Sequence, residues 1–248
     1  MPTIERAGAT IYYEDHGDPS LPPLFLLAPG GLNSTIDFWE RNAIKPLEVF
    51  AGEFRIIGMD QRNAGVRSKG PLDTADPWRM FADDQLAVLD HLGIDKTLVI
   101  GCCIGSSFIF ELLKLAPERI VAGVPMQPIG ADETNPGVFG PDMWRPWAQN
   151  LIDKGASFSM GDADAFGRGL FDAGFVFTAT RDELKSFNTP LLLLYGNDRA
   201  HPRGVSVQVG KLLPNVQIIE EWKDEAVVPG AIDKMRTFLR SHQLVSAR

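Results

Sequence analysis

Residues 101–105 read Gly101-Cys102-Cys103-Ile104-Gly105, with a glycine two positions before and two positions after a central cysteine. An apolar run at residues 97–100 precedes this stretch and a long apolar segment at residues 104–116 continues from it, an order that predicts a strand, a sharp turn and a helix. Glycines leave room where a tight turn brings backbone against its central residue. We therefore expect Cys103 at the corner of the turn, with its sulfur exposed above a sheet.

A cysteine in this position has the chemistry of a nucleophile. At the start of a helix, unpaired N–H groups and the helix dipole favour the thiolate and lower the pKa of the thiol toward neutrality. The backbone N–H of Ile104 would point at an oxyanion formed there. The alternative is a small buried thiol in a strand–helix turn, because free cysteines are among the most buried residues. The flanking glycines favour the nucleophile.

With this pentapeptide the chain resembles the α/β-hydrolase superfamily, in the variant that uses a cysteine nucleophile. The loop at residues 60–68, Asp-Gln-Arg-Asn-Ala-Gly-Val-Arg-Ser, is similar to the family's Asp-x-Arg-Gly-x-Gly-x-Ser loop, with residues 63 and 64 departing from it. The resemblance covers nearly the whole chain. It implies an α/β-hydrolase fold, in which a mostly parallel twisted sheet has helices on both faces and carries a small helical lid.

The order of apolar segments also predicts an α/β domain. Apolar runs typical of strands covered on both faces alternate with amphipathic segments, and these runs lie at residues 24–28, 55–59, 120–124, 191–195 and 216–219. Residues 132–186 differ, because they are rich in Gly, Pro, Asp and aromatic residues. We therefore expect a core formed by residues 1–131 and 187–248, with residues 132–186 inserted as a helical lid.

Composition restricts the class of protein and its partners. A chain of 248 residues with 44% hydrophobic residues is long enough for one α/β domain with an insertion. The net charge of -8 argues against nucleic acid or an anionic membrane as the main partner. The sequence shows no membrane span, signal peptide, metal-ligand cluster or phosphate loop. We therefore expect a cytoplasmic enzyme that acts on small molecules and uses no metal or cofactor. The two adjacent cysteines should both be reduced. The sequence leaves the oligomeric state open, and a homo-oligomer is one of the alternatives.

The catalytic acid and base are predicted from the loop after residues 191–195. Asp198 stands where the family places its acid; the alternative is an aspartate that forms a turn. The family's histidine is missing from the loop after the last predicted strand, residues 220–225, which reads Glu-Glu-Trp-Lys-Asp-Glu. Among four histidines, only His201 comes from a loop expected to face Cys103.

We therefore predict a pair of Cys103 and His201, oriented by Asp198. A solvent-exposed histidine before Pro202 is the alternative to this role for His201. Lys223 is a second candidate for the vacated position, although a solvated lysine in a charged loop is favoured there.

Binding residues are expected in two further segments. The run Pro29-Gly30-Gly31-Leu32 lies where the family carries a second backbone N–H of its oxyanion hole, so Gly31 or Leu32 should assist Ile104; a plain glycine turn is equally compatible. In residues 132–186 most aromatic side chains should pack against the core. We expect Trp144 and Trp147 to line a pocket, with Arg145 as a clamp for a carboxylate or as an exposed arginine.

These residues predict an enzyme that hydrolyses or transfers the acyl group of a small, largely apolar ester, thioester or lactone. One alternative is a catalytically incomplete protein of the same fold that binds a small ligand, which the missing histidine supports. Another is lyase-type chemistry without a covalent intermediate in the same pocket, for which turnover would survive Cys103→Ala.

Overall fold

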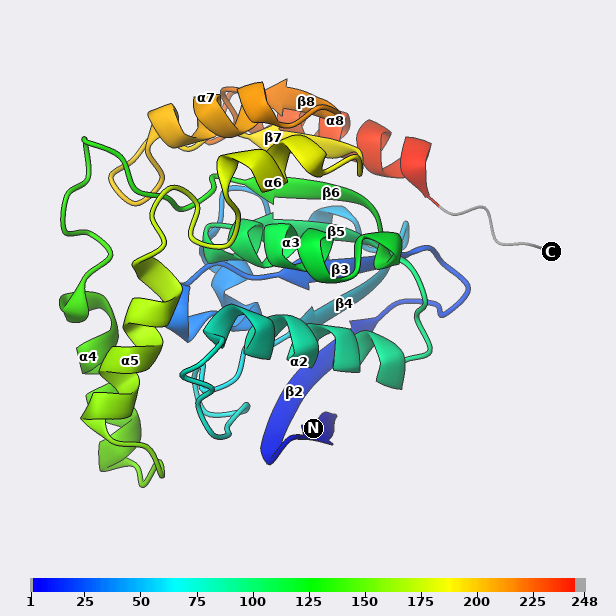
Figure 1. Cartoon of the computed structure of the whole chain (residues 1–248). Coiled ribbons are helices and arrows are strands. Elements are labelled where there is room, and N and C mark those ends of the chain that lie inside the picture. Colours follow the sequence, from blue (N-terminus) through cyan, green and yellow to red (C-terminus); the bar gives the residue numbers. More distant parts are fainter. Residues whose placement is uncertain (1, 244–248) are drawn as a thin grey trace.

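An eight-stranded sheet forms the centre of the computed structural model, which describes residues 2–243 (Figure 1). The strands, in their order across the sheet, are β1 (Thr3–Arg6), β2 (Ala9–His16), β4 (Arg55–Met59), β3 (Pro23–Leu27), β5 (Thr97–Cys102), β6 (Ile120–Met126), β7 (Leu191–Leu194) and β8 (Val216–Ile219). The pairs β1–β2 and β2–β4 are antiparallel, and all pairs from β4 to β8 are parallel. The expected α/β-hydrolase fold is confirmed.

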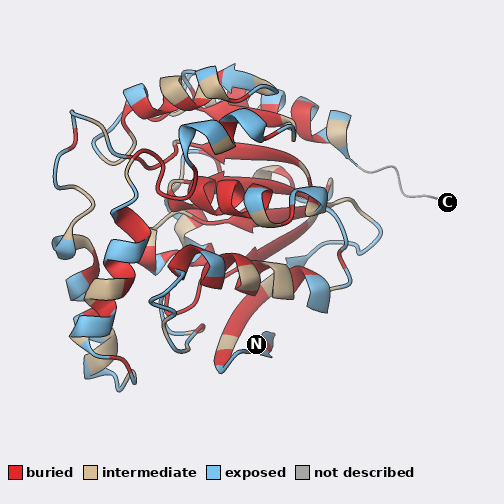
Figure 2. Cartoon of the chain, viewed as in Figure 1, coloured by how far each residue is buried: buried red, intermediate tan, exposed pale blue. Residues whose placement is uncertain are grey.

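Helices cover both faces of this sheet because its central strands are apolar on both sides (Figure 2). In β3, Phe25 and Leu27 join the apolar cluster beneath α2 (Pro77–His91), α3 (Ile104–Leu115) and α7 (Arg203–Leu212). Leu24 and Leu26 join the cluster on the other face, beneath α1 (Pro46–Val49) and α8 (Val228–His242). The alternation follows from the two-residue period of a strand.

Between β6 and β7 the chain leaves the sheet and forms three helices. Helices α4 (Pro141–Asp153) and α5 (Met160–Phe171) pack against each other at one end of the molecule, and α6 (Arg181–Ser186) contacts α7 (Figure 1). Two indole N–H groups tie the α4–α5 pair to the rest of the fold: Trp147 donates to the Asn63 carbonyl at 3.1 Å, and Trp78 donates to the Leu170 carbonyl at 3.0 Å. Both hydrogen bonds thus connect the α4–α5 pair to residues outside it.

Three short 3₁₀ turns, η1 (Gly31–Asn33), η2 (Ile36–Arg41) and η3 (Pro117–Arg119), complete the set of helical segments. The buried carboxylate of Asp60 holds η2 by accepting from the Ile36 N–H at 3.0 Å, and Arg67 donates to both of its oxygens. Nearby, the buried Arg62 donates two hydrogen bonds to Asp84 on α2. Residues 60–68 thus connect loops at the carboxyl end of the sheet.

Candidate active site

Cys103 occupies the corner between β5 and α3 in a backbone conformation that side chains rarely adopt, with φ of 59°. The two flanking glycines explain how the chain reaches it. A Cβ on Gly101 would lie 2.2 Å from the Gly105 carbonyl oxygen, and a Cβ on Gly105 would lie 2.1 Å from the Leu27 carbonyl oxygen. Side chains at these positions would push the strand and the helix apart, so the predicted strand, turn and helix depend on both glycines.

His201 reaches this corner from the loop after β7. Its Nδ1 lies 2.7 Å from Oδ1 of Asp198, and the backbone N–H groups of both residues bond across the same turn. Its Nε2 is buried and has no hydrogen-bond partner among residues 2–243. The His201 ring lies close enough to the Cys103 thiol for the two side chains to shift each other's pKa.

Gly196 makes the close turn of this loop possible. A Cβ on Gly196 would lie 2.4 Å from the His201 carbonyl oxygen and 2.6 Å from the His201 Cβ. The Gly196 N–H donates to the Ser206 hydroxyl of α7 at 2.9 Å, which anchors the start of the turn. The local spacing of Asp198 and His201 is therefore compatible with a direct contact, because the loop folds back on itself.

The second oxygen of Asp198 binds a residue from a different loop. Lys223, which follows β8, donates from Nζ to Oδ2 of Asp198 at 3.1 Å and to Oδ1 of Asn197 at 2.7 Å. Burial alone would raise the pKa of Asp198, but the hydrogen bond and charge of His201, with those of Lys223, hold it below its usual range. The carboxylate therefore stays ionised between two cationic groups.

The pKa values of Cys103 and His201 are shifted in opposite directions. Burial would raise the pKa of the Cys103 thiol, but hydrogen bonding and charge from His201 outweigh it, and the pKa lies below its ordinary value. Burial would lower the pKa of His201, whereas Asp198 and Cys103 raise it to about 9. Compared with isolated side chains, these shifts favour the thiolate of Cys103 and the imidazolium of His201.

Two backbone N–H groups also contribute to the low pKa of Cys103, those of Gly30 and Ile104. Ile104 is the residue predicted from the sequence. Gly30 precedes the predicted Gly31 and Leu32, and has φ of 122°, which turns the chain after β3 toward the sulfur. The pattern Pro-Gly-Gly-Leu does not say which of its N–H groups lies near Cys103, and the expected role of Gly31 or Leu32 stays a prediction.

Cys102 and Cys103 are both free thiols, as expected, but their surroundings differ. The Cys102 sulfur is fully buried on the other face of the sheet, where it accepts from Nδ2 of Asn42 at 3.1 Å and Nε2 of Gln127 at 3.4 Å. Burial raises the pKa of Cys102 to about 12. Cys102 is therefore a neutral, unreactive neighbour at neutral pH.

The three residues selected from the α4–α5 pair make contacts inside the fold. Trp144 and Arg145 both donate to the carboxylate of Asp164 on α5, and the Arg145 contact uses two hydrogen bonds at 2.9 and 2.8 Å. Trp147 stacks on Phe166 and donates to the Asn63 carbonyl. Arg145 is thus an exposed arginine paired with a carboxylate, and a role of any of the three in substrate binding stays a prediction.

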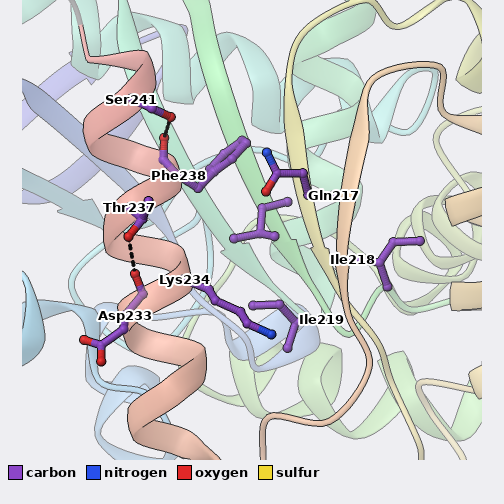
Figure 3. A pocket seen from close by; sticks show the side chains of 9 residues that line it. Gln217, Ile218, Ile219, Asp233, Lys234, Thr237, Phe238 and Ser241 are labelled. Atoms are coloured by element: carbon purple, nitrogen blue, oxygen red, sulfur yellow. Dashed lines mark hydrogen bonds between the residues drawn. The ribbon is translucent and has the colours of Figure 1, made fainter.

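A hollow of about 440 Å³ adjoins Asp198, and sequence reasoning did not find it. Its walls come from four segments that meet at the carboxyl end of the sheet, and its lining residues are Pro29, Phe38, Arg41, Asn42, Ala43, Gln127, Asp198, Trp222 and Lys223. Another hollow, of about 480 Å³, lies between β8 and α8 and contains Lys234 and Ile219 (Figure 3). None of its lining residues is Cys103, Asp198 or His201.

Fold and site together define an α/β-hydrolase-type protein. The sequence pattern of the alpha/beta hydrolase fold family matches residues 23–153, more than half of the chain, and the chain belongs to this family. Within residues 2–243, no helix is both long enough and apolar enough to cross a membrane.

Comparison with known proteins gives related sequences and structures. The chain is similar to carboxylesterase YbfK of Bacillus subtilis (strain 168), with 26% identity over 80% of this chain and 72% of that protein. It is also similar to rhodomycin D methylesterase DnrP of Streptomyces peucetius, with 36% identity over 49% of this chain and only 40% of the methylesterase. Among solved structures, the meta-cleavage product hydrolase CumD of Pseudomonas fluorescens IP01 superimposes with a TM-score of 0.71 at 17% identity, covering 97% of this chain and 98% of that one.

Proposed function

We propose that this protein hydrolyses a small, largely apolar ester, thioester or lactone with Cys103 as its nucleophile. The observation that carries the proposal is the arrangement of Cys103, at a corner with positive φ, near a buried histidine whose Nδ1 is bonded to Asp198. A nucleophile, a base and a group that orients the base are the parts that acyl transfer through a covalent intermediate requires.

The first half of the reaction forms an acyl-enzyme. The Cys103 thiolate attacks the acyl carbon, and the carbonyl electron pair moves to oxygen, where the N–H groups of Ile104 and Gly30 stabilise it. The position of Gly30 next to the sulfur favours it over Gly31 or Leu32 as the second donor. When the tetrahedral intermediate collapses, the bond to the leaving group breaks, and the leaving heteroatom takes the proton from Nε2 of His201.

The second half returns the enzyme to its starting state. Neutral His201 removes a proton from water, the resulting hydroxide attacks the thioester carbonyl, and the thiolate leaves as the acid is released. The imidazolium formed on His201 is stabilised by Asp198, which Lys223 holds from its other side. An alcohol, amine or thiol in place of water would give acyl transfer with the same residues.

Two further observations support a small ester as the substrate. Cys103 packs against both apolar clusters of the protein, so the acyl group would meet apolar walls. The related proteins named above are a carboxylesterase and a methylesterase. We propose that the α4–α5 pair acts as a lid over the acyl group.

The position of His201 also bears on the alternative of a ligand-binding protein. That alternative was based on the missing histidine after the last strand, but His201 supplies an imidazole from the preceding loop. Lyase-type chemistry would need no acyl-enzyme, so detection of the covalent intermediate separates it from the proposed reaction.

The test is to weigh the intact protein after brief incubation with short activated esters and thioesters and an acid quench. We expect an acyl adduct on the wild type and on Cys102→Ala, no adduct on Cys103→Ala, and an adduct that persists on His201→Gln because deacylation is slowed. An adduct that survives Cys103→Ala, or product formed by Cys103→Ala at the wild-type rate, would contradict the proposal.

A further inference from the structure

Asp198 lines the hollow of about 440 Å³, whereas Cys103 and His201 do not, and two further lining residues are next in the chain to residues that contact Cys103. Pro29 directly precedes Gly30, whose N–H lies near the Cys103 sulfur. Gln127 directly follows Met126, whose carbonyl accepts the Cys103 N–H at 2.9 Å. Asp198 holds His201. The hollow therefore lies next to the residues that flank Cys103 and His201.

Arg41 lines the hollow, and within residues 2–243 its guanidinium forms no ion pair. Its guanidinium lies 4.8 Å from the centre of the Phe38 ring. The neighbouring carboxylates have other partners, because Asp37 pairs with Arg67 and Glu40 pairs with Lys45. An arginine stacked on an aromatic ring, with its N–H fork available, suits recognition of a carboxylate.

The other polar groups of the lining lie among four apolar residues, which are Pro29, Phe38, Ala43 and Trp222. Lys223 uses its ammonium for Asn197 and Asp198, and one of its three N–H donors remains. Oε1 of Gln127 is buried and has no hydrogen-bond partner among residues 2–243, while Nε2 of the same amide is held by Cys102. Buried polar atoms of native proteins normally have partners, so this amide oxygen can accept a hydrogen bond from a donor group of a ligand.

We infer that this hollow binds the leaving group of the substrate, and that the leaving group carries a carboxylate held by Arg41. This inference rests on the proposed function. The leaving heteroatom must approach Nε2 of His201 to take its proton, so the leaving group lies on the side of His201 and Asp198. Substrates of this class are esters or thioesters of a small acyl group with a hydroxy acid or a mercapto acid.

The experiment compares three thioesters with wild type, Arg41→Gln and Arg41→Lys. S-acetyl mercaptopropionate carries the carboxylate on the leaving group, S-acetyl mercaptopropionamide is its neutral counterpart, and the S-methyl thioester of succinate carries the carboxylate on the acyl side. We expect Arg41→Gln to raise KM for the first compound roughly tenfold, with kcat little changed, because one charged hydrogen-bonding partner is lost. The neutral amide should be unaffected, and Arg41→Lys should recover part of the loss.

The matched control is Lys234→Gln, which removes a cation from the hollow between β8 and α8 (Figure 3) and should change no kinetic constant. Equal KM values of the wild type for mercaptopropionate and mercaptopropionamide thioesters, with acyl-enzyme still formed, would overturn the inference and leave the proposed function standing. If the wild type prefers only the succinate thioester, the substrate carboxylate is bound on the acyl side, and its placement on the leaving-group side is wrong. Absence of an acyl adduct with all three compounds would overturn both.

Discussion

Nζ of Lys223 lies 3.1 Å from Oδ2 of Asp198, on the carboxylate oxygen opposite the one that His201 contacts. Lys223 follows β8, in the loop where the family usually places its catalytic histidine. The imidazole and the ammonium thus hold one carboxylate from two loops. His201 supplies the ring that faces Cys103, and Lys223 fixes the carboxylate that orients this ring.

Lys223→Gln should lower kcat for a neutral thioester about tenfold with little change in KM, because the Asp198 carboxylate loses a charged partner and orients His201 less well. Lys223→Arg should restore part of kcat. Steady-state kinetics on S-acetyl mercaptopropionamide would measure both, since a neutral leaving group separates this effect from carboxylate binding. An increase in KM at constant kcat would mean that Lys223 contacts the substrate instead.

The thiolate of Cys103 should persist to lower pH than an ordinary thiol, because His201 lowers the pKa of Cys103 despite burial. The rate of alkylation by iodoacetamide, followed by mass spectrometry from pH 5 to 10, should rise with a midpoint below about 8.5, the ordinary value for a free cysteine. His201→Gln removes the stabilising charge while burial remains, so its midpoint should move to higher pH.

Cys102 provides the internal control for this titration, since burial raises its pKa to about 12. Cys103→Ala should therefore take up no label below pH 9. Identical midpoints for wild type and His201→Gln would show that the imidazole does not stabilise the thiolate.

Gly196→Ala should displace His201 from Cys103, because the added Cβ would lie 2.4 Å from the His201 carbonyl oxygen. We expect the alkylation midpoint of Cys103 to move toward that of His201→Gln, with a loss of unfolding free energy of roughly 1–3 kcal/mol. Gly230→Ala on α8 is the matched control, since no atom lies within 4 Å of its added Cβ. Urea unfolding measures the loss of stability, and the pH profile of alkylation measures the shift of the midpoint. The prediction is wrong if Cys103 in Gly196→Ala has the same alkylation midpoint as in the wild type.

Arg145→Ala should leave KM for both the mercaptopropionate and the succinate thioester unchanged, because Arg145 is exposed and its fork is occupied by Asp164. A small decrease in Tm is expected from the loss of this surface ion pair. Measuring KM of Arg145→Ala for these two carboxylate-bearing compounds tests this prediction. A selective rise in KM for either compound would restore Arg145 to the role of carboxylate clamp considered from the sequence.

The α/β-hydrolase fold was predictable because its signals are local. The apolar run before residue 101 and the glycines around Cys103 specify a strand, a turn and a helix through backbone sterics alone. The short strand β1 was not predicted, since four residues with a single buried side chain, Ile4, carry little pattern. His201 was also chosen from the sequence, because it lies in a loop after a strand that the resemblance to the family places next to Cys103.

What the sequence by itself determined is therefore the order of strands and helices and the identity of Cys103 as the corner residue. Only the tertiary structure decided three further contacts, which are Lys223 with Asp198, Arg145 with Asp164, and Arg41 with the hollow beside Asp198. The physical reason is that backbone conformation depends on near neighbours along the chain. The partners of a long polar side chain depend instead on how loops from separate strands pack against each other, and no local propensity encodes that arrangement.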